Sequence, residues 1–210
     1  MKDPVPRNVI SKAELDRLTQ IAAQLGASGA SVIPSGDVLA ENELAKICNG
    51  SQPCGSYGLA PSCPPHVSGP EGFRKWQEKS TYSIIVRIDI LSSAMFSDER
   101  REIMQLLHEI VAGVEQTAAE MGYLGSKAFA GGSCKNLFCQ DEADCLVLSD
   151  NGNCRYPQLA RPSMSGFGIN VAKLMQSAGW SGEKTTPEDA ADAESMSWVA
   201  GLIVIANVAA

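Results

Sequence analysis

Residues 82–121 read YSIIVRIDILSSAMFSDERREIMQLLHEIVAGVEQTAAEM and contain the two clearest elements of the chain. The first nine residues, YSIIVRIDI, are rich in β-branched side chains and predict a buried strand. Ser97 then offers a cap for a long helix from about residue 98 to 121, which Gly122 ends. The apolar side chains of this helix recur three and four residues apart: Ile103, Leu106, Leu107, Ile110, Val111 and Val114. A strand followed by a helix with one apolar face predicts helices packed on a sheet.

Further elements lie on both sides of this stretch. The sequence SKAE at residues 11–14 is typical of a capping box and predicts a helix that ends at Gly26. A third helical region is predicted from Pro162 to Gly179, while residues 37–47 fit either a strand or a helix. Strands are predicted at residues 30–34, 124–130 and 198–206, and the last is apolar throughout, as in a strand buried on both faces. The predicted fold class is therefore α/β or α+β, with a small sheet and packed helices in a single domain spanning residues 1–210.

The overall composition limits what the chain can do. Its 210 residues suffice for one domain with its own hydrophobic core. Lys and Arg total 17 against 24 for Asp and Glu, and this acidic balance disfavours binding to nucleic acid or to an anionic membrane surface. No apolar run reaches the roughly 18 residues of a membrane span, and the first residues lack the apolar core of a signal peptide. We therefore expect a cytoplasmic protein that binds neither nucleic acid nor membrane.

Seven cysteines are the most informative feature of the composition. They lie in two segments rich in Gly and Pro that we predict to be long loops, at residues 48–72 and 131–158. The first segment holds Cys48, Cys54 and Cys63, and the second holds Cys134, Cys139, Cys145 and Cys154. An odd number of cysteines without an export signal argues against a disulfide framework, and structural thiols would scatter through the core instead. Thiolates gathered in loops predict metal ligation.

The spacing of these cysteines favours iron–sulfur clusters over zinc. Structural zinc usually binds a pair of cysteines with two to four residues between them, often with histidine. Only Cys134 and Cys139 approach that spacing, and the two histidines do not form a ligand pair. We expect His108 to lie on the polar face of the long helix, and His66, which follows Cys63-Pro-Pro, to be a loop residue or part of the site. Wide spacing with adjacent Pro and Gly suits a bulky cluster wrapped by loops, and zinc stays the alternative.

The number of cysteines in each segment predicts two different sites. Four thiolates in the second segment can close a 4Fe–4S cluster completely. Three in the first segment would leave one iron with a water, a substrate or another ligand, and an incompletely ligated metal is typical of a catalytic site. Two alternatives stay open at this point: the ligands of the two segments mix, or a single metal centre is bound.

Several charged and aromatic side chains lie beside the cysteines. Lys135 and Arg155 each follow a cysteine directly, and Arg161 lies a little further along. Cations beside thiolates lower the pKa of thiols, offset the charge of a cluster and can hold an anionic substrate. The alternative is that they are ordinary loop charges. Tyr57, like His66, can pack within its loop or donate a hydrogen bond in the site.

Four sequence strings resemble those of a known family. They are C-x5-C-x2-YG-x4-CPPH from Cys48, GGSCKNLFC from residue 131, CRYPQLARPSMSGFGINV from Cys154, and AGW at residues 178–180. Over roughly residues 20–205 the chain resembles a prokaryotic family described as predicted metal-binding proteins, a domain of unknown function found largely in anaerobic bacteria and archaea. The resemblance implies that all seven cysteines belong to the family's motifs and that the cofactor is an iron–sulfur cluster, but it implies no reaction.

Three functions fit these observations. In the first, the chain is an enzyme or an enzyme-maturation factor whose open site on Cys48, Cys54 and Cys63 moves sulfur or electrons or binds a small ligand. The closed site then relays electrons or stabilises the fold. In the second, the chain is a pure electron carrier with two closed clusters and a redox partner protein. In the third, zinc stabilises a binding module that has no redox chemistry.

Overall fold

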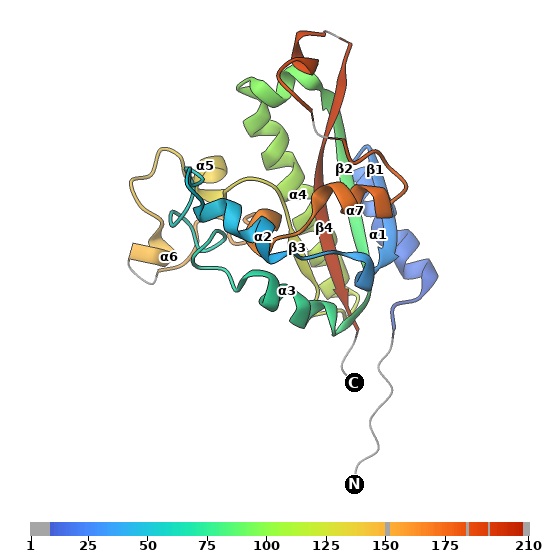
Figure 1. Cartoon of the computed structure of the whole chain (residues 1–210). Helices are drawn as coiled ribbons and strands as arrows, with labels where there is room; N and C mark the ends of the chain where they lie inside the picture. Colours follow the sequence, from blue (N-terminus) through green and yellow to red (C-terminus); the bar gives the residue numbers. More distant parts are fainter. Residues whose placement is uncertain (1–8, 150–151, 184, 193, 208–210) are drawn as a thin grey trace.

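A four-stranded antiparallel sheet lies in the middle of the molecule (Figure 1). The structure, a computed structural model, describes residues 9–149, 152–183, 185–192 and 194–207. The strands in these residues are β1 (Gly29–Pro34), β2 (Ser80–Leu91), β3 (Lys127–Phe129) and β4 (Met196–Ala206). Their order is β1-β2-β4-β3, and every neighbouring pair is antiparallel. The fold class is therefore α+β, and the α/β alternative is excluded because it needs parallel neighbours. The four strands predicted from the sequence are confirmed.

Helices cover both faces of this sheet. The helical elements that pack on it are α1 (Lys12–Gln24), α3 (Gly69–Gln77), α4 (Glu99–Glu120), the 3-10 turn η4 (Met164–Phe167) and α7 (Val171–Ser177). Successive residues of β2 alternate between two cores, because Ile84 and Val86 belong to the core with α1 and α4, while Ile85 belongs to the core with α3, η4 and α7. The prediction that β4 is buried on both faces is confirmed, since every residue from Val199 to Ala206 is buried.

Local sequence signals place the ends of the two long helices. The predicted capping box is present, because the Glu14 N–H donates to Ser11 Oγ at 3.3 Å and the Ser11 N–H donates to the Glu14 carboxylate at 2.9 Å. At α4 the N-cap residue is Asp98, one residue later than predicted. The hydroxyl of Ser97 still accepts the N–H of the first helical residue, at 3.3 Å. Gly122 follows the last turn of α4 with a φ of +101°, a conformation that favours glycine.

Two other predicted elements differ in part from the structure. Residues 37–47, which fitted a strand or a helix, are mainly helical and contain α2 (Asn42–Lys46). The helical region predicted from Pro162 begins later, because the side chain of Asn170 accepts a backbone N–H at 3.1 Å and caps α7 there. Between Pro162 and α7 the chain instead forms an isolated bridge at Ser163 and the turn η4.

The two cysteine segments lie beside the sheet, on the side of the molecule away from α1 (Figure 1). Short helical turns interrupt them: η2 (Ile47–Asn49), α5 (Cys134–Phe138) and α6 (Leu146–Ser149). The prediction that residues 48–72 and 131–158 are loops is therefore corrected at Cys48 and Cys134, which lie in short helical turns within these segments. Residues 150 and 151 lie outside the described residues, as do residues 1–8, where the sequence predicts no signal peptide. No helix of the described part of the chain is long and apolar enough to cross a membrane.

Candidate metal centre

The seven cysteines line two hollows. The first hollow has a volume of about 1060 Å³, and the second has a volume of about 540 Å³. Cys48, Cys54 and Cys63 line the first hollow, and Cys134, Cys139, Cys145 and Cys154 line the second. All seven thiols are free. The fold therefore gathers the cysteines by segment, three in one hollow and four in the other.

The thiols of each hollow are close enough to be affected by one another's charge. Burial raises the pKa of Cys48, and the charges of the other two thiolates of the first hollow raise it further. Burial also raises the pKa of Cys139; the Arg155 guanidinium opposes that rise, and the thiolates of Cys154 and Cys145 add to it. Cys48 and Cys139 are therefore protonated at neutral pH, and a bound metal would displace their protons.

Cys134 lies where the two hollows meet. Burial raises the pKa of its thiol to about 11, the Ser62 hydroxyl works against that rise, and the thiolate of Cys63 adds to it, ahead of those of Cys154 and Cys145. Ser62 Oγ lies 3.1 Å from Cys134 Sγ and 3.9 Å from Cys63 Sγ. One hydroxyl therefore contacts one cysteine of each hollow. No motif in the sequence marks Ser62 as part of the site.

The thiol donors suit a soft metal, although in this structure they lie too far apart to bind one. Sets of three or four thiols are the ligands that zinc and iron–sulfur clusters prefer. Within the described ranges, no three Cys, His, Asp or Glu side chains are close enough to hold a metal ion as they stand. Metal binding would therefore draw the sulfurs of a hollow inward, and part of the binding free energy would order the two segments.

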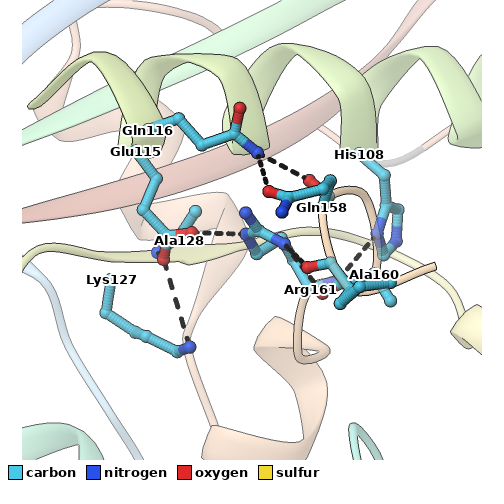
Figure 2. Close-up of polar contacts among 9 residues, drawn as sticks. His108, Glu115, Gln116, Lys127, Ala128, Gln158, Ala160 and Arg161 are labelled. Atoms are coloured by element: carbon cyan, nitrogen blue, oxygen red, sulfur yellow. Dashed lines mark hydrogen bonds and ion pairs between the residues drawn. The ribbon is translucent and has the colours of Figure 1, made fainter. Parts of the chain in front are cut away.

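Helix α4 contacts both ends of the second cysteine segment, and Figure 2 shows the contacts at the later end. His108 Nδ1 accepts the backbone N–H of Arg161 at 3.1 Å, so the ring proton is assigned to Nε2, which donates to the Gly131 carbonyl at 3.0 Å. Burial lowers the pKa of His108 and keeps the ring neutral. The prediction that His108 lies on the polar face of α4 is wrong, because the side chain is fully buried.

A buried ion pair secures the end of the same segment (Figure 2). Arg161 Nε lies 2.5 Å from Glu115 Oε2, and the two side chains are only 7% and 14% exposed. Glu115 also accepts the Ala128 N–H of β3 at 2.7 Å, and Gln116 donates to the Gln158 carbonyl at 3.0 Å. Arg161 was singled out as a cation beside the cysteines, but the structure places its guanidinium against α4 and not among the side chains that line either hollow. No local pattern in the sequence indicates Glu115 as its partner.

The buried histidine makes stability depend on pH. Below about pH 6.5 the unfolded chain binds a proton at His108 that the folded chain resists, so the free energy of unfolding falls as the pH falls. Between about pH 7 and 5.5 we expect a loss of up to about 1 kcal/mol, measured by urea unfolding. The chain has two histidines, which provide a matched pair of variants. His108→Gln should remove this pH dependence and His66→Gln should retain it; the opposite pattern would contradict the assignment.

The second hollow is cationic and partly aromatic. Its charged and aromatic lining residues are Lys127, Lys135, Arg155, His66, Trp76, Phe138, Tyr156 and Phe167, and no carboxylate of a described residue lines it. Lys135 Nζ donates to the carbonyls of Cys139 and Glu142 at 2.7 and 2.6 Å, and Arg155 forms an ion pair with Glu142 at 2.8 Å. Three of the residues singled out beside the cysteines therefore line this hollow, while Tyr57 lines the first hollow.

Two thiol-lined hollows on an α+β scaffold are the arrangement expected of a metal-binding protein. The chain belongs to the family described as predicted metal-binding protein (DUF2284), whose model matches residues 31–204. This match includes all seven cysteines and confirms the resemblance carried by the sequence motifs. Comparison with curated proteins and with solved structures gave no match.

Proposed function

We propose that the chain binds two iron–sulfur clusters and uses one of them for chemistry. The observation that carries this proposal is the division of the seven thiols into three and four around two hollows. Four thiolates, from Cys134, Cys139, Cys145 and Cys154, complete the ligation of a 4Fe–4S cluster in the second hollow. Three thiolates, from Cys48, Cys54 and Cys63, leave one iron in the first hollow open to a small ligand.

The contacts around the second hollow support a cluster over a single zinc ion. The cationic side chains that line it offset the negative charge that four thiolates bring to one place. The Tyr156 N–H donates to Cys154 Sγ at 3.4 Å, and hydrogen bonds to sulfur are one of the means by which proteins tune a cluster. A single zinc ion would draw all four sulfurs to about 2.3 Å from the metal. A cluster is larger and fills more of a hollow of about 540 Å³.

The proposed division of labour follows from the positions of the two hollows. When bound, the clusters supply electron transfer and, at the open iron, Lewis-acid chemistry. Ser62 contacts Cys63 and Cys134, so it lies on a short path for electrons between the two sites. Lys135 and Arg155 hold the turn around Cys139 through Glu142. The natural reactant is a small molecule at the first hollow or a redox partner protein, and a reducing cytoplasm suits seven free thiols.

The alternatives are a pure electron carrier and a zinc-stabilised binding module. The first hollow is about twice as large as the second and carries polar side chains beyond its cysteines. A carrier with two closed clusters has no need of that space, because electron transfer requires no bound substrate. The size of the first hollow therefore favours ligand handling.

Anoxic purification of the full chain, followed by iron and acid-labile sulfide analysis and EPR before and after dithionite, tests this proposal. We expect a brown protein that contains both iron and acid-labile sulfide and gives two distinguishable EPR signals. One signal should change when a small ligand binds, since only one cluster has an open iron. A colourless protein that holds zinc would overturn the proposal, and two ligand-insensitive signals would favour the electron carrier.

A further inference from the structure

The first hollow extends beyond its three cysteines to two helices. The beginning of α4 lines it with Arg101 and Gln105, and α5 lines it with Asn136 together with Ser133, which precedes that helix. Asn136 Nδ2 donates to Ser56 Oγ at 2.9 Å, which ties α5 to the first cysteine segment. The hollow is therefore lined both by the three cysteines and by polar side chains of α4 and α5.

Arg101 is the one charged side chain lining this hollow, among the described residues, that is not exposed to solvent. The other three, Asp98, Arg100 and Glu102, are exposed at the start of α4. Arg101 Nε donates to the Leu137 carbonyl at 3.2 Å, which fixes the guanidinium. The guanidinium forms no ion pair with any residue that the structure describes. A half-buried cation held in this way is a partner for an anion that the chain itself does not supply.

Ser133 gives a second and independent indication of a ligand. It is only 5% exposed, and its Oγ is buried and has no hydrogen-bond partner in the described part of the chain. It precedes α5 directly, yet its side chain makes no capping hydrogen bond. A buried hydroxyl without a partner costs free energy that a ligand oxygen would recover. Ser133 lines the same hollow as Arg101 and the three cysteines.

We infer that the first hollow binds a small molecule through a carboxylate or phosphate group held by Arg101 and Ser133. This inference rests on the proposed function in one respect: the rest of the molecule would lie toward the open iron on Cys48, Cys54 and Cys63. The guanidinium supplies a charge-assisted pair of donors, and the hydroxyl supplies a third. The exposed carboxylates of Asp98 and Glu102 are solvated and lie outside this pairing. A ligand that fits this hollow therefore has one anionic end for Arg101 and Ser133 and one polar end for the metal.

Calorimetric titration of the anoxically purified full chain with inorganic phosphate, acetate and malonate, at constant ionic strength, tests this inference. We expect at least one of these probes to bind, and Arg101→Gln to weaken that binding about tenfold or more. Ser133→Ala should weaken it severalfold without loss of stability, since the hydroxyl makes no bond within the described chain. Arg17→Gln removes an exposed charge from α1 and should leave binding unchanged.

Iron content, measured on the same samples, separates this inference from the proposed function. The anion site is overturned, whatever the iron content, if no probe binds the wild-type chain. It is also overturned if the Arg101→Gln and Ser133→Ala variants bind the probe as tightly as the Arg17→Gln variant does. If the chain holds no iron but anion binding depends on Arg101 and Ser133, the site stands and the proposed function fails. Should Arg101→Gln not fold, Ser133→Ala decides the result alone.

Discussion

Replacing Glu115 with alanine is expected to lower the free energy of unfolding by about 3–5 kcal/mol, the usual cost of removing one partner from a buried ion pair. The change would leave the Arg161 guanidinium buried opposite an apolar side chain, 2.5 Å from where its carboxylate partner stood. It would also remove the acceptor of the Ala128 N–H in β3. Urea unfolding monitored by circular dichroism measures the effect directly.

A surface ion pair gives the matched control for this substitution. Lys12 and Asp16 are 2.7 Å apart on α1, but their side chains are 88% and 53% exposed. Asp16→Ala should therefore cost less than about 1 kcal/mol, because water and salt screen such a pair. If the two substitutions cost the same, the Glu115–Arg161 pair does not anchor the second cysteine segment to α4.

Replacing Cys139 with serine is expected to remove about half of the bound iron and to lower the melting temperature of the anoxic protein more than any change at the first hollow. Cys139 is one of four thiols in the second hollow, so its loss would open the proposed cluster, which four thiolates would otherwise ligate fully. Under the proposed function, that cluster would hold together the segment that α4 anchors at His108 and Glu115, and its binding free energy would also be folding free energy. Iron analysis and differential scanning calorimetry of the same sample give both values.

Cys54→Ser is the counterpart at the first hollow. Cys54 is exposed, and the cluster proposed for its hollow would keep one ligand position open in any case. We expect this change to lose the iron of the first site, with a smaller fall in melting temperature. Equal losses of iron and of stability from the two substitutions would mean that the two hollows are equivalent, and absence of any iron loss would exclude both cysteines as ligands.

The periodic elements of the fold could be predicted from the sequence because their signals are local. The β-branched run of β2, the apolar run of β4 and the capping box at Ser11 each lie within a few residues. The antiparallel order of the sheet could not be derived, because the strands are joined by long segments with no pairing signal. The burial of His108 could have been predicted, since it lies one turn after Met104 and one turn before Val111 on the apolar face of α4.

The candidate site was predictable in its donor atoms but not in their surroundings. Two cysteine-rich segments are visible in the sequence, and the structure places each set of thiols around its own hollow. The contact of Ser62 with Cys134 joins residues 72 positions apart. The Arg161–Glu115 pair also joins residues far apart in the sequence, beyond the reach of any local pattern. Such contacts depend on how the segments pack against α4, which spacing within one segment does not encode. The positions of Arg101 and Ser133 in the first hollow depend on the same packing.

Anomalous diffraction at the iron absorption edge, from crystals of the full chain grown without oxygen, tests the metal assignment most directly. Strong iron peaks should occupy both hollows, one beside Cys134, Cys139, Cys145 and Cys154, and the other beside Cys48, Cys54 and Cys63. Crystals that hold no iron in either hollow, or in which these cysteines are oxidised to one another, would contradict it.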